Sequence, residues 1–195
     1  MTIIQTPAHD TPERIITDYR ISHTPRVWVG CLSCYNHGHL VGAWYDAEEA
    51  GDITVAEVHH DGGHPHGCSG EELWVFDNNN MGDAGEMSPH EATEWGERFR
   101  ELTDSRDWPA YLVYSNNFGR NGELPEVRDF EEAYRGRFDE FSDYAYQSAQ
   151  ETGLQNGWPE IAKRHFSWSG YCEEVQQDYL VADAHPGFYV FWAHQ

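Results

Sequence analysis

Cysteine and histidine side chains, which are common zinc ligands in proteins, gather in two stretches of this 195-residue chain. The first stretch holds a Cys-x-x-Cys pair, Cys31 and Cys34. The second holds four histidines and one cysteine, namely His59, His60, His64, His66 and Cys68. Ligands at this density are able to hold zinc, so a metal-dependent hydrolase built on residues 59–68 is an alternative function for the chain.

A glycine- and histidine-rich surface loop over residues 59–70 is the simpler interpretation of the second stretch. The β-forming residues from Arg26 to Tyr35 predict that Cys31 and Cys34 lie on one strand, where side chains three positions apart point to opposite faces. The chain also has no second Cys-x-x-Cys pair. We therefore expect no metal ligand and no cofactor.

The polar run DNNNMG over residues 77–82 is similar to the first half of a calcium-binding loop. Such a loop needs a ligand at its fifth position and a bidentate glutamate at its twelfth. This chain has Met81 and Ser88 at those positions. We interpret the run as a polar turn.

Carboxylates dominate the ionisable side chains. The chain holds 34 acidic residues against 12 lysines and arginines, which gives a formal net charge of -22 and a pI of about 4.7. With so many acids present, any pair chosen as general acid and base would be uninformative. The sequence contains no nucleophile elbow, phosphate-binding loop or His-Glu-x-x-His motif. We expect no catalytic residues and no enzymatic activity.

This charge excludes whole classes of partner. A protein that binds nucleic acid directly must bring lysine and arginine to the phosphates, and an anionic membrane also attracts basic residues. The charge is spread along the chain, with 13 acids and 3 bases in residues 1–85 and 21 acids and 9 bases in residues 86–195. Solubility, adaptation to high salt and ordinary drift in an acid-rich lineage are the plain alternative reasons for such a field.

The N-terminus lacks the pattern of a signal peptide, and no apolar run approaches membrane-spanning length. We therefore expect a cytoplasmic protein with reduced thiols. Four tryptophans occupy positions typical of a core, although they could instead line a sugar-binding groove. These are Trp28, Trp44, Trp95 and Trp168.

Short strands are predicted in the first half of the chain. Two β-rich runs, over residues 26–35 and 40–45, flank an Asn/Gly-containing connector and predict a hairpin. Residues 71–76 predict a third strand. Residues 46–56 predict a short helix that Gly51 interrupts.

The second half is predicted to be mainly helical. Ser88 and Pro89 form a helix start, with serine as the N-cap and proline at the first helical position. In the helix that follows, Ala92, Trp95, Phe99 and Leu102 share an apolar face, and Glu91, Glu94, Glu97 and Glu101 an acidic one. Further helices are predicted over residues 109–118, 124–134, 139–152, 159 onward and 169–178, before a terminal strand over residues 187–192.

The helix predicted over residues 139–152 repeats this division of faces. Gly153 follows it as a helix stop. Phe141, Tyr144 and Ala145 share the predicted inner face, and Asp139, Glu140 and Asp143 the outer one.

Several short runs of residues within these predicted elements resemble the ArdA family of antirestriction proteins. Mobile elements and phages carry such proteins against host type I restriction enzymes. The most specific block is YNHGHLVGAW over residues 35–44, because it combines turn residues with a fixed aromatic spacing. Further matching runs are RVWVG at 26–30, FEEAYRG at 130–136, DYA at 143–145, ETG at 151–153, FSWSGY at 166–171 and the terminal strand. Residues 1–25, interpreted as an N-terminal arm, and residues 59–70 look like additions relative to shorter members of this family.

The resemblance implies an α+β fold in an elongated chain of small domains that dimerises. The N-terminal domain would be an antiparallel sheet unit, the central one helical, and the C-terminal one α+β with a final strand. The expected boundaries are a flexible arm over residues 1–25, then domains over residues 26–87, 88–128 and 129–195.

The resemblance also implies a DNA mimic that occupies the DNA-binding groove of a type I restriction-modification enzyme. It would inhibit by stoichiometric competition and would form a homodimer. Carboxylates three or four positions apart on a helix lie about 5–6 Å apart, close to the spacing of phosphates along a strand. The mimic surface is expected to consist of fifteen acids, here named the acidic set: Glu91, Glu94, Glu97, Glu101, Glu123, Glu126, Asp129, Glu131, Glu132, Asp139, Glu140, Asp143, Glu173, Glu174 and Asp178.

Overall fold

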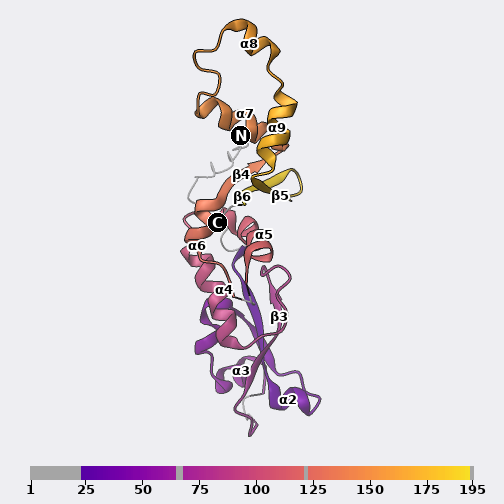
Figure 1. Cartoon of the computed structure of the whole chain (residues 1–195). Coiled ribbons are helices and arrows are strands. Elements are labelled where there is room, and N and C mark those ends of the chain that lie inside the picture. The colour runs from indigo at the N-terminus through magenta and orange to yellow at the C-terminus, as the bar shows by residue number, and fades with distance from the viewer. Residues whose placement is uncertain (1–22, 65–67, 121–122, 194–195) are drawn as a thin grey trace, which may run out of the picture. The chain divides into compact units, whose positions relative to one another are not determined.

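The computed structural model of the chain describes residues 23–64, 68–120 and 123–193 (Figure 1). Helices and two three-stranded antiparallel sheets make up this part of the chain, which confirms the predicted α+β class. The chain divides into two compact units, Met1–Leu112 and Val113–Gln195. That boundary falls inside residues 88–128, and the three-domain division stays a prediction. The predicted arm lies outside the described residues as far as residue 22.

The N-terminal unit is built on a sheet with the strand order β2-β1-β3. Its strands are β1 (Arg26–Cys31), β2 (Gly42–Asp46) and β3 (Leu73–Asn79). The pairing of β1 with β2 is antiparallel and sets Trp28 opposite Trp44, so the predicted hairpin is confirmed. Val27 and Val29 alternate on the buried face of β1 and are fully covered by the core.

The strand predicted to run as far as Tyr35 is wrong beyond Cys31. A short helix, α2 (Leu32–Asn36), follows β1 at once. The pairing of β1 with β2 ends at Gly30 and Gly42, so the chain beyond it has no ladder to continue on β2. The backbone N–H of Leu32 instead donates to the carbonyl of Glu72, 3.1 Å away.

The single interrupted helix predicted over residues 46–56 is replaced by two elements. A 3₁₀ helix, η1 (Ala47–Asp52), is followed by α3 (Val55–Asp61). The separation follows from Thr54, which is the N-cap of α3. Its hydroxyl accepts from the N–H of Glu57, and the Glu57 carboxylate accepts from the N–H of Thr54 at 2.8 Å. This capping box starts a new helix and satisfies donors that would otherwise be unpaired.

Helix α4 (Pro89–Glu101) begins where the sequence predicts. The Ser88 hydroxyl accepts from the N–H of Glu91, whose carboxylate accepts from the N–H of Ser88 at 2.7 Å. The predicted apolar face is confirmed, because its residues contact the core. Ala92, Phe99 and Leu102 are buried, and Trp95 is half-buried.

Close approach fastens α4 to the N-terminal unit. Gly96 is buried against η1, and a Cβ added to it would lie only 2.2 Å from the backbone nitrogen of Glu48. Arg100, in the last turn of α4, also pairs with the Glu48 carboxylate. Since the inner face of α4 is held in this way, its acidic residues are directed outward.

The aromatic core differs from the one predicted. Trp44 is 41% exposed, so its assignment to the core is wrong, and Trp28, Trp95 and Trp168 are half-buried. A fully buried tryptophan is instead Trp108, at the start of α5 (Trp108–Phe118) after the 3₁₀ turn η2 (Ser105–Asp107). Its ring nitrogen donates to the carbonyl of Asn80 at 2.7 Å. Asn80 lies 28 positions before Trp108, and helix or strand propensity, which depends on neighbouring residues, cannot predict a contact over that separation.

The polar turn predicted over residues 77–82 begins later than expected. Strand β3 continues through Asn79, and the chain turns at Asn80, whose φ is 62°. Asparagine tolerates this left-handed conformation better than most residues. Met81, the residue that argued against a calcium loop, is fully buried.

The C-terminal unit has a second sheet with the strand order β4-β6-β5. Its strands are β4 (Tyr134–Phe138), β5 (Tyr179–Asp183) and β6 (Phe188–Trp192), and its helices are α6 (Val127–Ala133), α7 (Phe141–Glu151), α8 (Glu160–His165) and α9 (Trp168–Gln176). The terminal strand is confirmed. The helix predicted over residues 124–134 is wrong at both ends, since α6 covers Val127–Ala133, and neither β4 nor β5 was predicted. Both are five-residue strands whose pairing with β6 is non-local.

Aromatic contacts hold this second unit together. Phe141, Tyr144 and Ala145 are buried on the inner face of α7, as predicted. The Tyr144 hydroxyl donates to that of Tyr179 at 2.7 Å, and burial raises the pKa of Tyr144 well above its ordinary value. Helix α8 buries none of its residues. The core of the unit therefore lies between α7, α9 and the sheet.

Candidate functional site

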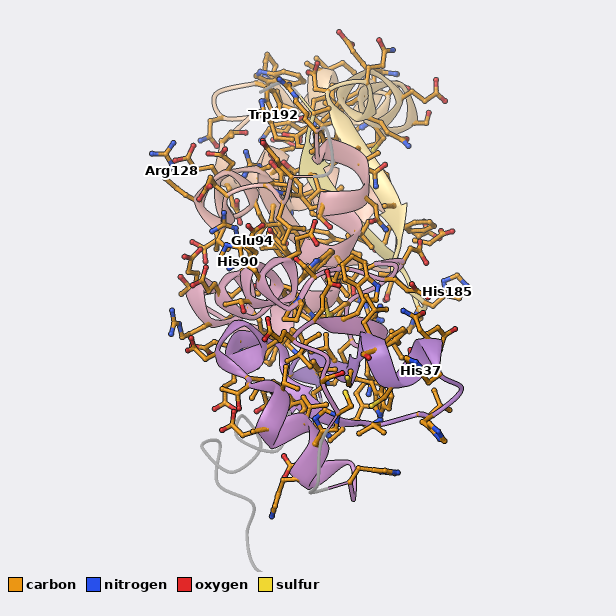
Figure 2. All side chains as sticks on the ribbon, turned by 90° about the horizontal axis from the view of Figure 1, so that it is seen from below. His37, His90, Glu94, Arg128, His185 and Trp192 are labelled. Atoms are coloured by element: carbon orange, nitrogen blue, oxygen red, sulfur yellow. The ribbon has the colours of Figure 1, made fainter. Side chains whose placement is uncertain are left out.

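Helix α4 presents most of its predicted acids to solvent. Glu91, Glu94 and Glu101 are exposed, and Glu97 is half-buried. Glu94 and His90, one helical turn apart on α4, are both labelled in Figure 2. The acidic face predicted from helical periodicity is therefore an outer face of the N-terminal unit.

Two acids of α4 also have local structural partners. Glu91 completes the capping box, and its hydrogen bonds from the hydroxyl and N–H of Ser88 lower the pKa of its carboxyl. Glu101 pairs with Arg98 at 3.1 Å. The Arg98 side chain is 20% exposed and that of Glu101 46%, so the arginine partly offsets the charge of this carboxylate at the edge of the acidic face.

Helix α6 carries acids beside an arginine. Glu131 and Glu132 are exposed on the helix, and Asp129 is half-buried in its first turn. Arg128 contacts Asp129 at 3.4 Å and Glu132 at 3.6 Å. The arginine side chain is itself 81% exposed, so it reduces the local negative charge without removing it.

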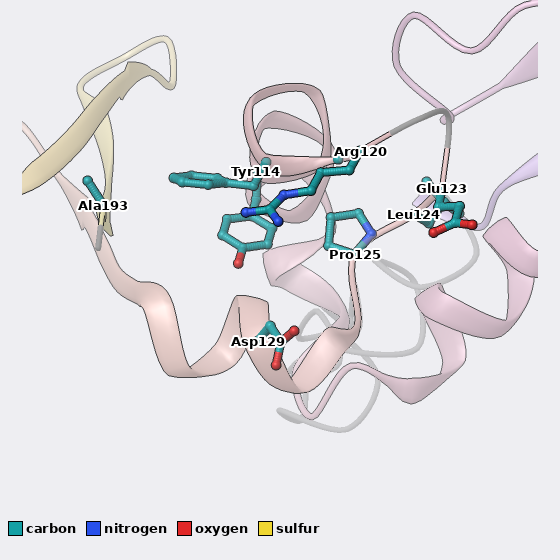
Figure 3. Close-up of a pocket in the computed structure, with 9 residues that line it drawn as sticks. Tyr114, Arg120, Glu123, Leu124, Pro125, Asp129 and Ala193 are labelled. Carbon is teal, nitrogen blue, oxygen red and sulfur yellow. The ribbon is translucent and has the colours of Figure 1, made fainter. Parts of the chain in front are cut away.

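Two members of the acidic set line a pocket of the C-terminal unit. The pocket encloses about 360 Å³. Figure 3 shows Arg120 and Glu123 on the segment after α5, Asp129 on α6, and Tyr114 between these segments. Figure 3 shows the Arg120 side chain extending over Tyr114, and the lining also includes the carboxylates of Glu123 and Asp129, so the pocket is of mixed polar character. Glu123 is exposed and Asp129 is half-buried, so lining this pocket removes neither carboxylate from the surface.

The predicted outer face of α7 is wrong for two of its three acids. Asp139 and Glu140 precede the helix, which begins at Phe141. The N–H of Glu140 donates to the Asp143 carboxylate at 3.1 Å, which caps the first turn. Negative charge at a helix N-terminus is favoured by the helix dipole, and this local role explains part of the acidity here. All three acids are exposed.

Helix α9 and the residues after it carry the rest of the acidic set. Glu173 and Glu174 are exposed on the helix, and Asp178 is exposed just before β5. Glu126, also exposed, is the N-cap of α6. Of the fifteen acids, all of which the structure describes, thirteen are exposed and two are half-buried. Both compact units contribute, and the acids extend over several helices.

A second group of ionisable side chains lies inside the N-terminal unit. Cys31, Cys34, His59 and Cys68, named here the thiol–imidazole cluster, bring their ligand atoms within 4.8 Å of one another. Cys31 and Cys34 do not point apart as predicted, because β1 ends at Cys31 and α2 turns Cys34 back towards it. The surface-loop interpretation is also wrong for His59, which is buried on α3.

Two other histidines of the second stretch, His60 and His64, have partners outside the cluster. His60 pairs with the Asp61 carboxylate at 2.9 Å, and the His64 ring contacts the carbonyl of Gly62 at 3.1 Å. His66 lies outside the described residues. The sequence offered one signal for His59. Thr54 and Glu57 form a capping box that starts a helix, and His59 follows the apolar Val58 on that helix, where both residues are buried.

The thiols of the cluster differ in acidity. Burial raises the pKa of Cys34, and contacts with the other two thiols raise it further. The pKa of Cys68 is lowered to about 6, first by the N–H of Gly70, which donates to its sulfur at 3.3 Å, and then by the Cys31 thiol. Cys68 is therefore the sulfur that most readily becomes a thiolate.

In the part of the chain that the structure describes, no helix has the length and apolar character needed to cross a membrane. Residues 27–190 match the family described as Antirestriction protein (ArdA), from the second residue of β1 into β6. No individually curated protein matches the chain. The family match spans both compact units and confirms the resemblance. The chain therefore belongs to the ArdA family of antirestriction proteins, and this membership supports an antirestriction function rather than an enzymatic one.

Proposed function

We propose that this protein is a DNA mimic that occupies the DNA-binding groove of a type I restriction-modification enzyme and inhibits it by stoichiometric competition. The observation that carries the proposal is the exposure of the acidic set on a chain with a net charge of -22. The proposal requires no catalytic residue and no cofactor. It also implies a cytoplasmic protein, since restriction enzymes act there.

The spacing of the carboxylates supports imitation of a phosphate backbone. Side chains three and four positions apart on a helix are about 5–6 Å apart, and Glu91, Glu94 and Glu101 are exposed along one helix. DNA-binding proteins make half or more of their hydrogen bonds to phosphate oxygens and sugars. Carboxylates at this spacing could therefore accept the hydrogen bonds that the groove donates to phosphate oxygens. Binding of this kind needs no contact with a DNA base.

A homodimer is part of the proposal. Two copies would carry a formal charge of -44, which equals the charge on about 75 Å of duplex at one charge per about 1.7 Å. A field of this size would attract a basic groove from a distance and raise the association rate. Light scattering on the purified protein gives the molar mass, and a monomer at micromolar concentration would remove this part of the proposal.

The deciding experiment is a competition assay. A labelled duplex is bound to a type I enzyme, and the protein is titrated against the complex at several salt concentrations. We expect displacement near equal molar amounts and a steep loss of affinity with added salt, because ions condensed on the enzyme and its mimic are released on binding. Displacement that is indifferent to salt, or inhibition while the duplex stays bound, would contradict the proposal.

A matched variant controls for the number of surface changes. The charge is tested with a variant in which Glu91, Glu94, Glu97 and Glu101 are replaced by glutamine. Its control replaces four exposed glutamines by alanine, which alters as many surface side chains but leaves the net charge at -22. We expect this control to inhibit as the unmodified protein does. The four positions are Gln147, Gln150, Gln176 and Gln177.

A further inference from the structure

Four atoms able to bind a metal converge within the N-terminal unit. Cys31 Sγ lies 3.4 Å from Cys68 Sγ, and Cys34 Sγ lies 3.4 Å from His59 Nε2. All four atoms lie within 4.8 Å of one another. Tetrahedral zinc, with bonds of about 2.3 Å to sulfur and about 2.0 Å to nitrogen, separates its ligands by roughly 3.5–3.8 Å. Two of the separations are already close to this range and the others are no longer than 4.8 Å, so only small shifts of the side chains would bring the cluster to the size of a zinc site.

The surroundings of the histidine prepare it as a ligand. His59 Nδ1 lies 2.8 Å from the carbonyl oxygen of Val55, which can only accept a hydrogen bond. Nδ1 therefore carries the proton and donates it, which leaves the lone pair of Nε2 directed at the cluster. Metal-binding histidines almost always have such a partner on the other ring nitrogen, which sets the tautomer and the ring orientation.

The surroundings of Cys68 serve the same purpose. The backbone N–H of Gly70 donates to its sulfur at 3.3 Å, a contact that favours the thiolate form that zinc requires. A Cβ added to Gly70 would lie 2.3 Å from Cβ of Ser33. Glycine at this position therefore allows the segment that carries Cys68 to approach α2.

The ligands come from four separate places in the chain. Cys31 ends β1, Cys34 lies on α2, His59 on α3, and Cys68 precedes β3. Figure 1 shows α2 and α3 at the same end of the N-terminal unit. Cys31 and His59 are only 1% and 2% exposed, so most of the donor set is inside the unit.

We propose that the thiol–imidazole cluster binds one Zn²⁺ ion and that this ion fastens the segment before β3 to β1, α2 and α3. Three cysteines and one histidine complete a tetrahedral coordination sphere and leave no position for water or substrate. The site is therefore structural. This also removes the basis for the hydrolase alternative, which needs an open coordination position.

The first test measures the metal in the unmodified protein. The chain is expressed with zinc in the medium and purified with a histidine-free tag and without chelator, and its zinc content is measured by elemental analysis. We expect about one zinc per chain. The Co²⁺-exchanged protein should show thiolate-to-cobalt charge transfer and the strong visible bands of tetrahedral cobalt. A protein that holds no zinc after equimolar zinc is added, or an octahedral cobalt spectrum, would overturn the proposal.

The second test assigns the ligands. Cys68→Ser changes the one exposed ligand, so it disturbs the fold least, and it should lower the zinc affinity and the Tm. Cys172→Ser removes a thiol of the C-terminal unit, and His60→Ala removes the exposed neighbour of His59, and both should keep one zinc per chain. Zinc that persists in Cys68→Ser but is lost in His60→Ala would assign the metal to the histidine-rich stretch and overturn the cluster. If Cys68→Ser fails to fold, the cobalt spectrum of the unmodified chain decides.

Oxidation is the competing use of the same sulfurs. Cys31 Sγ and Cys68 Sγ are close enough that a modest movement would allow a disulfide, which would take two ligands from the metal. Intact mass and thiol titration of the protein purified under argon distinguish the two states. Four free thiols after denaturation with chelator support zinc, and two free thiols would overturn it.

Discussion

In the thiol–imidazole cluster, four side chains from four segments lie within 4.8 Å, and three of them are buried. The fifteen carboxylates of the acidic set are instead spread over several helices in both units, and none is buried. The first arrangement depends on each member, because a metal that loses one of four ligands loses its coordination. The second depends on the sum, because each carboxylate adds a small share to a field. If both proposals hold, one chain uses ionisable residues locally for stability and collectively for recognition.

Metal removal should produce the largest effect. Incubation with a strong chelator removes an ion whose binding is coupled to folding, which is worth about 10–16 kcal/mol in small zinc-finger peptides. We expect less here, because the N-terminal unit has an aliphatic core of its own. Calorimetry should show a fall in Tm that added zinc reverses. A Tm that the chelator leaves unchanged would show that the thiol–imidazole cluster does not stabilise the fold through a bound metal.

Mild acid should produce the next largest effect, on the collective arrangement. Protonation of the 11 histidines other than the proposed zinc ligand His59 would change the formal charge from -22 to -11. We therefore expect competition with DNA to weaken progressively between about pH 7 and pH 5.5. A competition curve that does not move over this range would count against an electrostatic mechanism.

The capping carboxylates separate that loss from unfolding. Hydrogen bonds from Thr54 and Ser88 lower the pKa values of Glu57 and Glu91. A carboxyl with a lowered pKa stabilises the fold above its ordinary value near 4.3 and loses that contribution as the pH falls through the folded pKa. The caps should therefore persist at pH 5.5. Far-ultraviolet circular dichroism at each pH should show unchanged helix content while inhibition declines.

Removing four charges from α4 should have a smaller effect. Replacing Glu91, Glu94, Glu97 and Glu101 by glutamine leaves the capping box possible, because glutamine also serves at its third position. We expect weaker competition and a decrease of up to about 4 in the slope of log affinity against log salt, by analogy with loss of phosphate contacts. An unchanged slope would show that α4 does not face the enzyme.

A single acid should matter least. Glu94→Gln removes one exposed charge without disturbing a cap, and we expect a change in unfolding free energy within about 0.5 kcal/mol. Competition should weaken by no more than a few-fold. Complete loss of inhibition in this variant would mean that Glu94 makes a specific, indispensable contact. It would contradict recognition by a collective field of carboxylates.

The local features of the fold were predictable because they depend on neighbours in the sequence. Ser88, Pro89 and Glu91 predict the start of α4, and the period of Ala92 and Phe99 predicts its buried face. The hairpin of β1 and β2 was equally accessible, because β-rich runs flank a turn. Membership of the antirestriction family also followed from sequence blocks, which the family match over residues 27–190 confirms.

The features that failed were those decided by partners far away in the sequence. The sequence predicts a helix as far as Tyr134 and no element over residues 135–138, whereas Tyr134 and Phe138 pair with Phe191 and Phe188 of β6 in strand β4. Trp44 resembled a core residue, but the sheet leaves it 41% exposed.

By itself the sequence determined the charge, the helix caps and the amphipathic faces, since each follows from composition or from residues within a few positions of one another. Only the tertiary structure decided that Cys31, Cys34, His59 and Cys68 meet. The physical reason is that β1 ends at Cys31, where its ladder with β2 has run out, and the turn into α2 reverses the direction in which Cys34 points. Pairing along a sheet is a non-local interaction, and where it stops is set by the partner strand.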